Sequence, residues 1–208
     1  SGNWSGAYSG SYGQKIGRTI GTYGTTENNA AVVNIYGGTY ALGIGMGHEG
    51  ASSINSYVYV YGGTMPTVHG SGLGSSGSMV DKGKTNVLIT GTSTKVNGTV
   101  FGGSTNGSHT GDINLVIKNG TITGTIYGGS SSKNVTGNIS ISILGGSVRS
   151  IIGGCATGSI DGTVSLNISG GTVTGDIYTS GQGGTQEDNT AYYQGSNVDS
   201  TETDAQIL

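Results

Sequence analysis

Residues 113–130 read INLVIKNGTITGTIYGGS, and three other stretches of the chain repeat this pattern. They are 87–104 (VLITGTSTKVNGTVFGGS), 139–155 (ISISILGGSVRSIIGGC) and 164–181 (VSLNISGGTVTGDIYTSG). Three columns of aliphatic residues recur at intervals of 25 or 26 residues: Val87, Ile113, Ile139 and Val164; Val96, Ile122, Val148 and Val173; Val100, Ile126, Ile151 and Ile177. One period held by three independent columns indicates a structural repeat.

Each repeat is predicted to form short strands joined by sharp turns at glycine residues. Aliphatic residues recur at every second position, as in Ile113, Leu115 and Ile117, and from Ile139 to Ile143 they alternate with Ser, which is the period of a strand with one buried face. The strand breaks at Asn119-Gly120, and two shorter strands follow it. The sequence therefore predicts an all-β protein, a parallel β-solenoid (β-helix) with coils of about 25 residues. An antiparallel sandwich or barrel is the alternative, but it gives no reason for a period of this length.

The repeat divides the chain into three parts. Two further coils, 30–50 and 56–74, precede the four regular ones, so the predicted solenoid spans 30–181. Residues 1–29 form an irregular Gly/Tyr-rich segment, and residues 182–208 form an acidic polar segment without Lys or Arg. Each is expected to be a cap or a subunit contact, because open solenoid ends expose unpaired backbone groups. The chain begins at Ser1 without a signal peptide, as expected of a processed or excised piece.

Composition limits the partners and the location of the protein. Of 208 residues, 44 are Gly and only 9% are charged, with 8 basic and 11 acidic side chains. Such a chain offers no basic face for nucleic acid, and no apolar run is long enough to span a membrane. Low charge, a single Cys and abundant Gly, Ser, Thr and Asn are typical of secreted or cell-surface bacterial repeat proteins.

The polar residues do not form a recognisable catalytic or metal-binding pattern. The three histidines come from different coils, with His69 expected in the column of Ile44, and they lack metal-ligand spacing. Asp112 aligns with Asn138 and Thr163, whereas Asp176 lies in another column, so no carboxylate pair is evident. Cys155 occupies the position of Ser104 and Ser130 and reads as a small loop residue. No catalytic, metal-binding or cofactor-binding residue, and therefore no enzyme, is predicted.

Aromatic residues supply the candidate contacts. Phe101, Tyr127, Ile152 and Tyr178 occupy one outward column, and Tyr36 and Tyr61 form a second pair one coil apart. Exposed aromatic columns bind sugar faces or pack against a second protein. The alternative is that the first column packs beneath the loop that follows it.

The segments GGTVTGDIY (170–178) and NGTITGTIYGG (119–129) resemble the Gly-Gly-rich repeats of large bacterial surface proteins. These include β-solenoid adhesins of the autotransporter-passenger and polymorphic-outer-membrane types. The resemblance covers residues 30–181 and rests on repeat style. It implies an extracellular, non-catalytic scaffold.

Taken together, these patterns favour a structural or adhesive protein that assembles with copies of itself into a filament or surface layer. The candidate inserts between subunits are the apolar residues of the two flanking segments: Ile16, Ile20, Val198, Ile207 and Leu208. A monomer whose ends fold back over its own open coils is the alternative assembly state. The alternative function is a carbohydrate-binding or polysaccharide-acting β-helix protein, with glycans as partners of the aromatic column.

Overall fold

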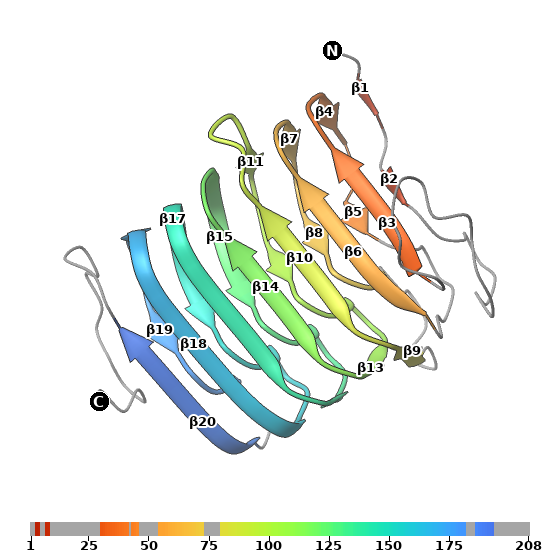
Figure 1. Ribbon diagram of the computed structural model, residues 1–208, viewed down its shortest axis with the longest axis vertical. Coiled ribbons are helices and arrows are strands. Elements are labelled where there is room, and N and C mark those ends of the chain that lie inside the picture. Colours follow the sequence, from red (N-terminus) through yellow and green to blue (C-terminus); the bar gives the residue numbers. More distant parts are fainter. Residues whose placement is uncertain are drawn as a thin grey trace.

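Parallel strands stacked coil upon coil make up the computed structural model (Figure 1). The structure describes residues 3–4, 7–8, 30–41, 43–45, 54–72, 80–181 and 186–193. Within these ranges it contains strands and turns but no helix. In the regular coils the strands pair in parallel with strands 25 or 26 residues away, as β14 does with β17 and β17 does with β18. The predicted parallel β-solenoid is thereby confirmed.

The longest strands share one face of the solenoid, and Figure 1 shows them side by side in chain order. This long sheet consists of β3 (Ala30–Ile35), β6 (Asn55–Val60), β10 (Thr85–Ile89), β14 (Ile113–Ile117), the first part of β17 (Ile139–Ile152), the middle of β18 (Ile160–Val173) and β20 (Gln186–Tyr193).

Two faces of short strands close each coil. The second face contains β4 (Thr39–Tyr40), β7 (Thr64–Met65), β11 (Lys95–Val96) and the start of β15 (Thr121–Tyr127). The third face contains β5 (Ile44–Gly45), β8 (Val68–His69), β12 (Val100–Phe101), the end of β15 and β19 (Ile177–Tyr178). Short strands then lead back to the long sheet: β9 (Val80–Lys82), β13 (Ser108–Thr110) and β16 (Val135–Thr136).

The ladder continues beyond both ends of the predicted solenoid. At the N-terminal end, β1 (Asn3–Trp4) pairs with β4 and β2 (Ala7–Tyr8) pairs with β5. At the C-terminal end, β20 pairs with β18. The five predicted inserts lie outside the described residues: Ile16, Ile20, Val198, Ile207 and Leu208. No helix of the described residues is long and apolar enough to cross a membrane.

Aliphatic side chains from all three faces fill the interior. The predicted columns of Val96 and Val100 are in register as expected, and their members are at most 1% exposed. In the first predicted column, Ile113, Ile139 and Val164 are in register as expected. Only the placement of Val87 was wrong, by two residues, because Val87 pairs with Leu115 and Thr85 pairs with Ile113. The turn from Ile89 to Lys95 is two residues longer than its counterpart in the next coil, which moves the long strand relative to the shorter ones.

This correction places two hydroxyls in the core. Ser56 and Thr85 take the position that Ile113 occupies in the next coil, and both are 1% exposed. Their hydroxyl oxygens lie 3.0 Å apart, and Ser56 Oγ donates to the carbonyl oxygen of Gly70 at 2.7 Å. The pair is therefore satisfied internally, as buried polar groups generally are.

Glycines make the corner between the long sheet and the second face. As predicted from the Gly pairs, the second Gly of each pair has a positive φ, for example +102° at Gly63 and +87° at Gly146. A Cβ added at Gly146 would lie 2.7 Å from the carbonyl oxygen of Gly120 in the preceding coil. Both the backbone conformation and the close stacking of the coils thus require glycine here.

Gly146→Ala is expected to destabilise the protein by about 2 kcal/mol or more, since it adds left-handed strain to a backbone clash. Gly37→Ala is the matched control, because a Cβ there meets nothing within 4 Å. The control should change stability by less than about 0.5 kcal/mol. Urea denaturation of both variants measures the difference, and equal midpoints would contradict the proposed role of the corner.

Candidate functional site

The predicted outward aromatic column exists and is longer than expected. Phe101, Tyr127, Ile152 and Tyr178 are in register, and His69 joins them beside Phe101. The expectation that His69 shares the column of Ile44 was wrong, since Ile44 pairs with Val68. The segment from the glycine corner to β8 is one residue shorter than the segment before β5, which shifts the alignment by one position.

Much of this column is covered. The rings of His69, Phe101 and Tyr127 stack at centroid distances of 5.4 Å and interplanar angles of 11°. Phe101 is 8% exposed and Ile152 is 2% exposed, while Tyr127 and Tyr178 are half-buried. Burial raises the pKa of the Tyr127 phenol. The geometry agrees with the alternative in which the column packs beneath the following loops, and it leaves little ring surface for a ligand.

The two described buried histidines are held neutral. Burial lowers the pKa of His69 to about 3, and its ring nitrogens bond to the hydroxyls of Thr67 at 3.0 Å and Thr105 at 2.9 Å. Burial lowers the pKa of His109 to about 4, although the Gly111 backbone and the Asp112 charge act in the opposite sense. Neither ring is positioned for proton transfer to an external substrate.

Cys155 is a packing residue. It is fully buried, and the backbone N–H of Ser130 in the preceding coil donates to its sulfur at 3.4 Å. Burial raises the pKa of the thiol to about 11, so the reactive thiolate is scarce at neutral pH. This placement agrees with its interpretation as a small loop residue.

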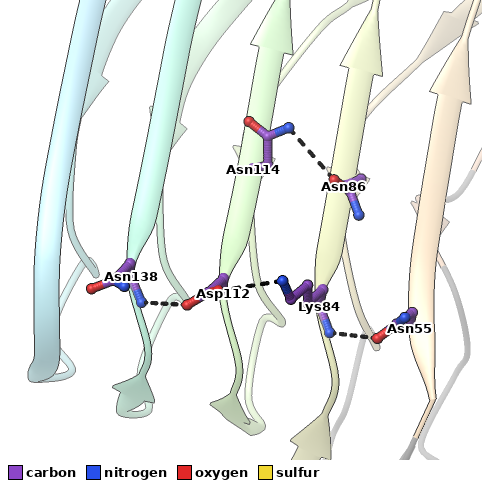
Figure 2. A network of polar contacts seen from close by, with 6 residues as sticks. All are labelled: Asn55, Lys84, Asn86, Asp112, Asn114 and Asn138. Atoms are coloured by element: carbon purple, nitrogen blue, oxygen red, sulfur yellow. Dashed lines mark hydrogen bonds and ion pairs between the residues drawn. The ribbon is translucent and has the colours of Figure 1, made fainter.

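A ladder of polar side chains follows the corner where each coil enters the long sheet (Figure 2). Asn55 Oδ1 accepts from the backbone N–H of Lys84 at 2.9 Å, and Asp112 Oδ1 accepts from that of Asn138 at 3.1 Å. Asn138 Oδ1 in turn accepts from the N–H of Thr163 at 3.0 Å. The predicted alignment of Asp112, Asn138 and Thr163 is confirmed.

The side-chain oxygens of the ladder accept hydrogen bonds from backbone N–H groups of the next coil, which would otherwise lack a partner at the corner. The second oxygen of Asp112 lies 3.9 Å from Lys84 Nζ in an exposed ion pair (Figure 2). Within the described part of the chain, no three His, Cys, Asp or Glu side chains gather closely enough to hold a metal ion. Asp112 therefore acts here as a corner residue.

The most exposed aromatic group lies on the outer face of the long sheet. Tyr36 and Tyr61, paired from the sequence, stack with ring centroids 4.9 Å apart and an interplanar angle of 8°. Tyr36 is 76% exposed and Tyr61 37% exposed. Tyr57 and Tyr59 extend the group along β6, with centroids 6.1 Å apart and Tyr59 6.4 Å from Tyr61. We name these four residues the tyrosine cluster.

The cluster extends the pair predicted from the sequence. Tyr57 and Tyr59 were not singled out, although their alternation with Val58 and Val60 marks them as outward residues of a strand. Because Tyr36 and Tyr61 are exposed, Tyr57 and Tyr59 are half-buried beside them and all four lie on a fixed sheet, the tyrosine cluster is the strongest candidate site among the described residues. Comparisons with protein-family models, curated proteins and solved structures found no match for this chain.

Proposed function

We propose that this protein is a non-catalytic, extracellular structural or adhesive β-solenoid, secreted or held at a bacterial surface, that assembles with copies of itself. One observation carries the proposal. Strand β20 pairs with β18 from Gln186 to Tyr193, and no described strand pairs with its other edge. An edge of this kind offers a row of N–H and C=O groups to another chain.

The low charge of the chain also supports assembly. Charged side chains make up 9% of the chain, so few of them oppose contact between copies. A contact between the C-terminal end of one copy and the N-terminal end of the next is head-to-tail. Such contacts do not close on themselves and instead produce filaments or layers.

Light scattering of the full chain tests the proposal. We expect the mass to grow with concentration beyond the monomer's 20.7 kDa. Thr190→Pro and Ala191→Pro form a test pair, because adjacent residues of a parallel strand direct their N–H groups to opposite edges. The variant that removes the N–H group facing away from β18 should slow the growth of the assemblies. A mass of 20.7 kDa at every concentration, with both termini protected from protease, would contradict assembly.

Carbohydrate binding is the second candidate function, and a specific observation favours it. The alternative based on Phe101, Tyr127 and Tyr178 is weakened by the burial of Phe101, but Tyr36 and Tyr61 present exposed rings. A polysaccharide-acting enzyme would release oligosaccharides from a glycan that it binds. Detection of such products by chromatography would refute the non-catalytic proposal.

A further inference from the structure

We infer that the tyrosine cluster binds an uncharged polysaccharide. This inference rests on the adhesive role proposed above and names the class of ligand. It is carried by the fixed spacing of the rings, by the exposure of Tyr36, by the amides beside the rings and by the lack of charge on the strands that present them.

The backbone ladder sets the positions of the rings. Val58 and Val60 are fully buried, so Tyr57, Tyr59 and Tyr61 project outward at every second residue, about 6.6 Å apart along the strand. The 4.9 Å between the rings of Tyr36 and Tyr61 matches the distance between neighbouring strands. A ligand thus meets rings already held in place, which reduces the entropy cost of binding.

The exposed ring surface suits the apolar face of a sugar. Tyr36 and Tyr61 are nearly parallel, so each ring covers one face of the other. Because Tyr36 is 76% exposed, its second face is open to solvent. The C–H groups on one side of a pyranose ring pack on the electron-rich face of an aromatic ring. A sugar ring at this position would continue the stack that the two tyrosines begin.

Amide side chains adjoin the rings on the same outer face. Asn34 is in register with Tyr59, and Asn86 is in register with Tyr57. Asn86 on β10 accepts a hydrogen bond from Asn114 Nδ2 on the neighbouring strand β14, at 3.5 Å (Figure 2). An amide both donates and accepts hydrogen bonds, so this row matches the hydroxyl groups of a sugar.

The charge of the surface selects among ligand classes. Strands β3, β6 and β10 contain no charged residue in their described spans. Lys84, at the corner before β10, is already paired with Asp112. An acidic polysaccharide, a nucleic acid or a phospholipid headgroup would find no cation on these strands to neutralise it. An uncharged polymer with apolar faces and many hydroxyls fits the surface.

Sedimentation with insoluble cellulose and chitin, together with affinity electrophoresis in a soluble neutral β-glucan, tests the inference. We expect binding to at least one of these polymers and none to polygalacturonate. Tyr36→Ala and Tyr61→Ala should each weaken binding about tenfold, and Tyr36→Phe should retain it because the ring is kept. Circular dichroism checks that each variant is folded.

Leu144→Ala is the matched control. Leu144 is 44% exposed and follows the buried Ile143 in β17, and Ile143 occupies the position of its coil that Val60 occupies before Tyr61. The Leu144→Ala variant should bind the neutral polymers as the parent protein does. Absence of binding to all three neutral polymers, or equal binding by the parent and the Tyr→Ala variants, would overturn the inference.

Light scattering on the same samples separates this inference from the proposed function. If the protein assembles but binds no neutral polymer, the glycan inference fails and the structural role stands. If Tyr36→Ala prevents assembly and leaves polymer binding unchanged, the cluster is a contact between copies and the inference is also overturned.

Discussion

Replacing Ile141 with Asp is expected to leave no folded protein at 25 °C. Ile141 is 0% exposed and lies in register between Leu115 and Leu166, each also fully buried. A carboxylate at this position has no partner in the aliphatic interior, and burying it costs several kcal/mol beyond the roughly 2–5 kcal/mol lost with the aliphatic side chain. The sum is comparable with the whole stability of a typical domain, about 5–15 kcal/mol.

Ser140→Asp is the control for this experiment. Ser140 is the preceding residue of β17, and its side chain is exposed on the outer face of the sheet. The same carboxylate there should change stability by less than about 0.5 kcal/mol. Far-UV circular dichroism and urea denaturation compare the two variants. A folded Ile141→Asp protein with parental stability would show that the Leu115–Ile141–Leu166 column is not the core.

The period of the chain was sufficient to predict the fold, because a solenoid repeats its core residues at fixed positions of every coil. The columns of Val96 and Val100 keep their spacing since short strands and tight glycine corners leave little room for insertion. The alignment of Val87 with Ile113 failed because a turn can lengthen without disturbing the strands on either side. The number of residues between equivalent positions of two coils can therefore differ from one face of the solenoid to another.

Which aromatic residues are exposed could not be predicted from local sequence. Phe101 and Tyr61 each follow an inward valine, yet Phe101 is 8% exposed and Tyr61 37%. The difference arises in the following segment. Thr105, four residues after Phe101, bonds to His69 in the preceding coil, 36 residues away, and the loop that carries it lies against the column. Contacts between coils of this kind leave no signal in the spacing of single residues.

The two buried histidines should make the protein lose stability in acid. Their folded-state pKa values, about 3 for His69 and about 4 for His109, lie below the usual 6.5 because burial disfavours the charged ring. The unfolded chain therefore binds more protons than the folded protein below pH 6.5. The stabilisation is fully present above that pH and is lost as the pH falls toward each folded-state value.

The expected size of this effect is large. For His109, the difference between 6.5 and about 4 corresponds to roughly 3 kcal/mol, and the contribution of His69 is larger because its pKa is lower. Urea denaturation at pH 7.5, 6.0, 5.0 and 4.5 would measure it as a falling midpoint. Most of the loss should occur below pH 6, where the unfolded histidines are largely protonated and the folded ones are not.

Substitution of His109 separates the histidines from other acid-sensitive groups. His109 is 2% exposed and lies in register with Val135, and neither of its ring nitrogens makes a hydrogen bond of good geometry, although the Gly111 backbone lies close enough to favour the charged ring. His109→Leu should therefore be at least as stable as the parent at pH 7.5, because it removes unpaired buried polar atoms, and its stability should fall less steeply with acid. His69→Leu should also flatten the pH dependence but lower stability at pH 7.5, since the hydroxyls of Thr67 and Thr105 lose their partner. An unchanged pH dependence in the double variant would assign the acid sensitivity to the carboxylates and refute the role of the histidines.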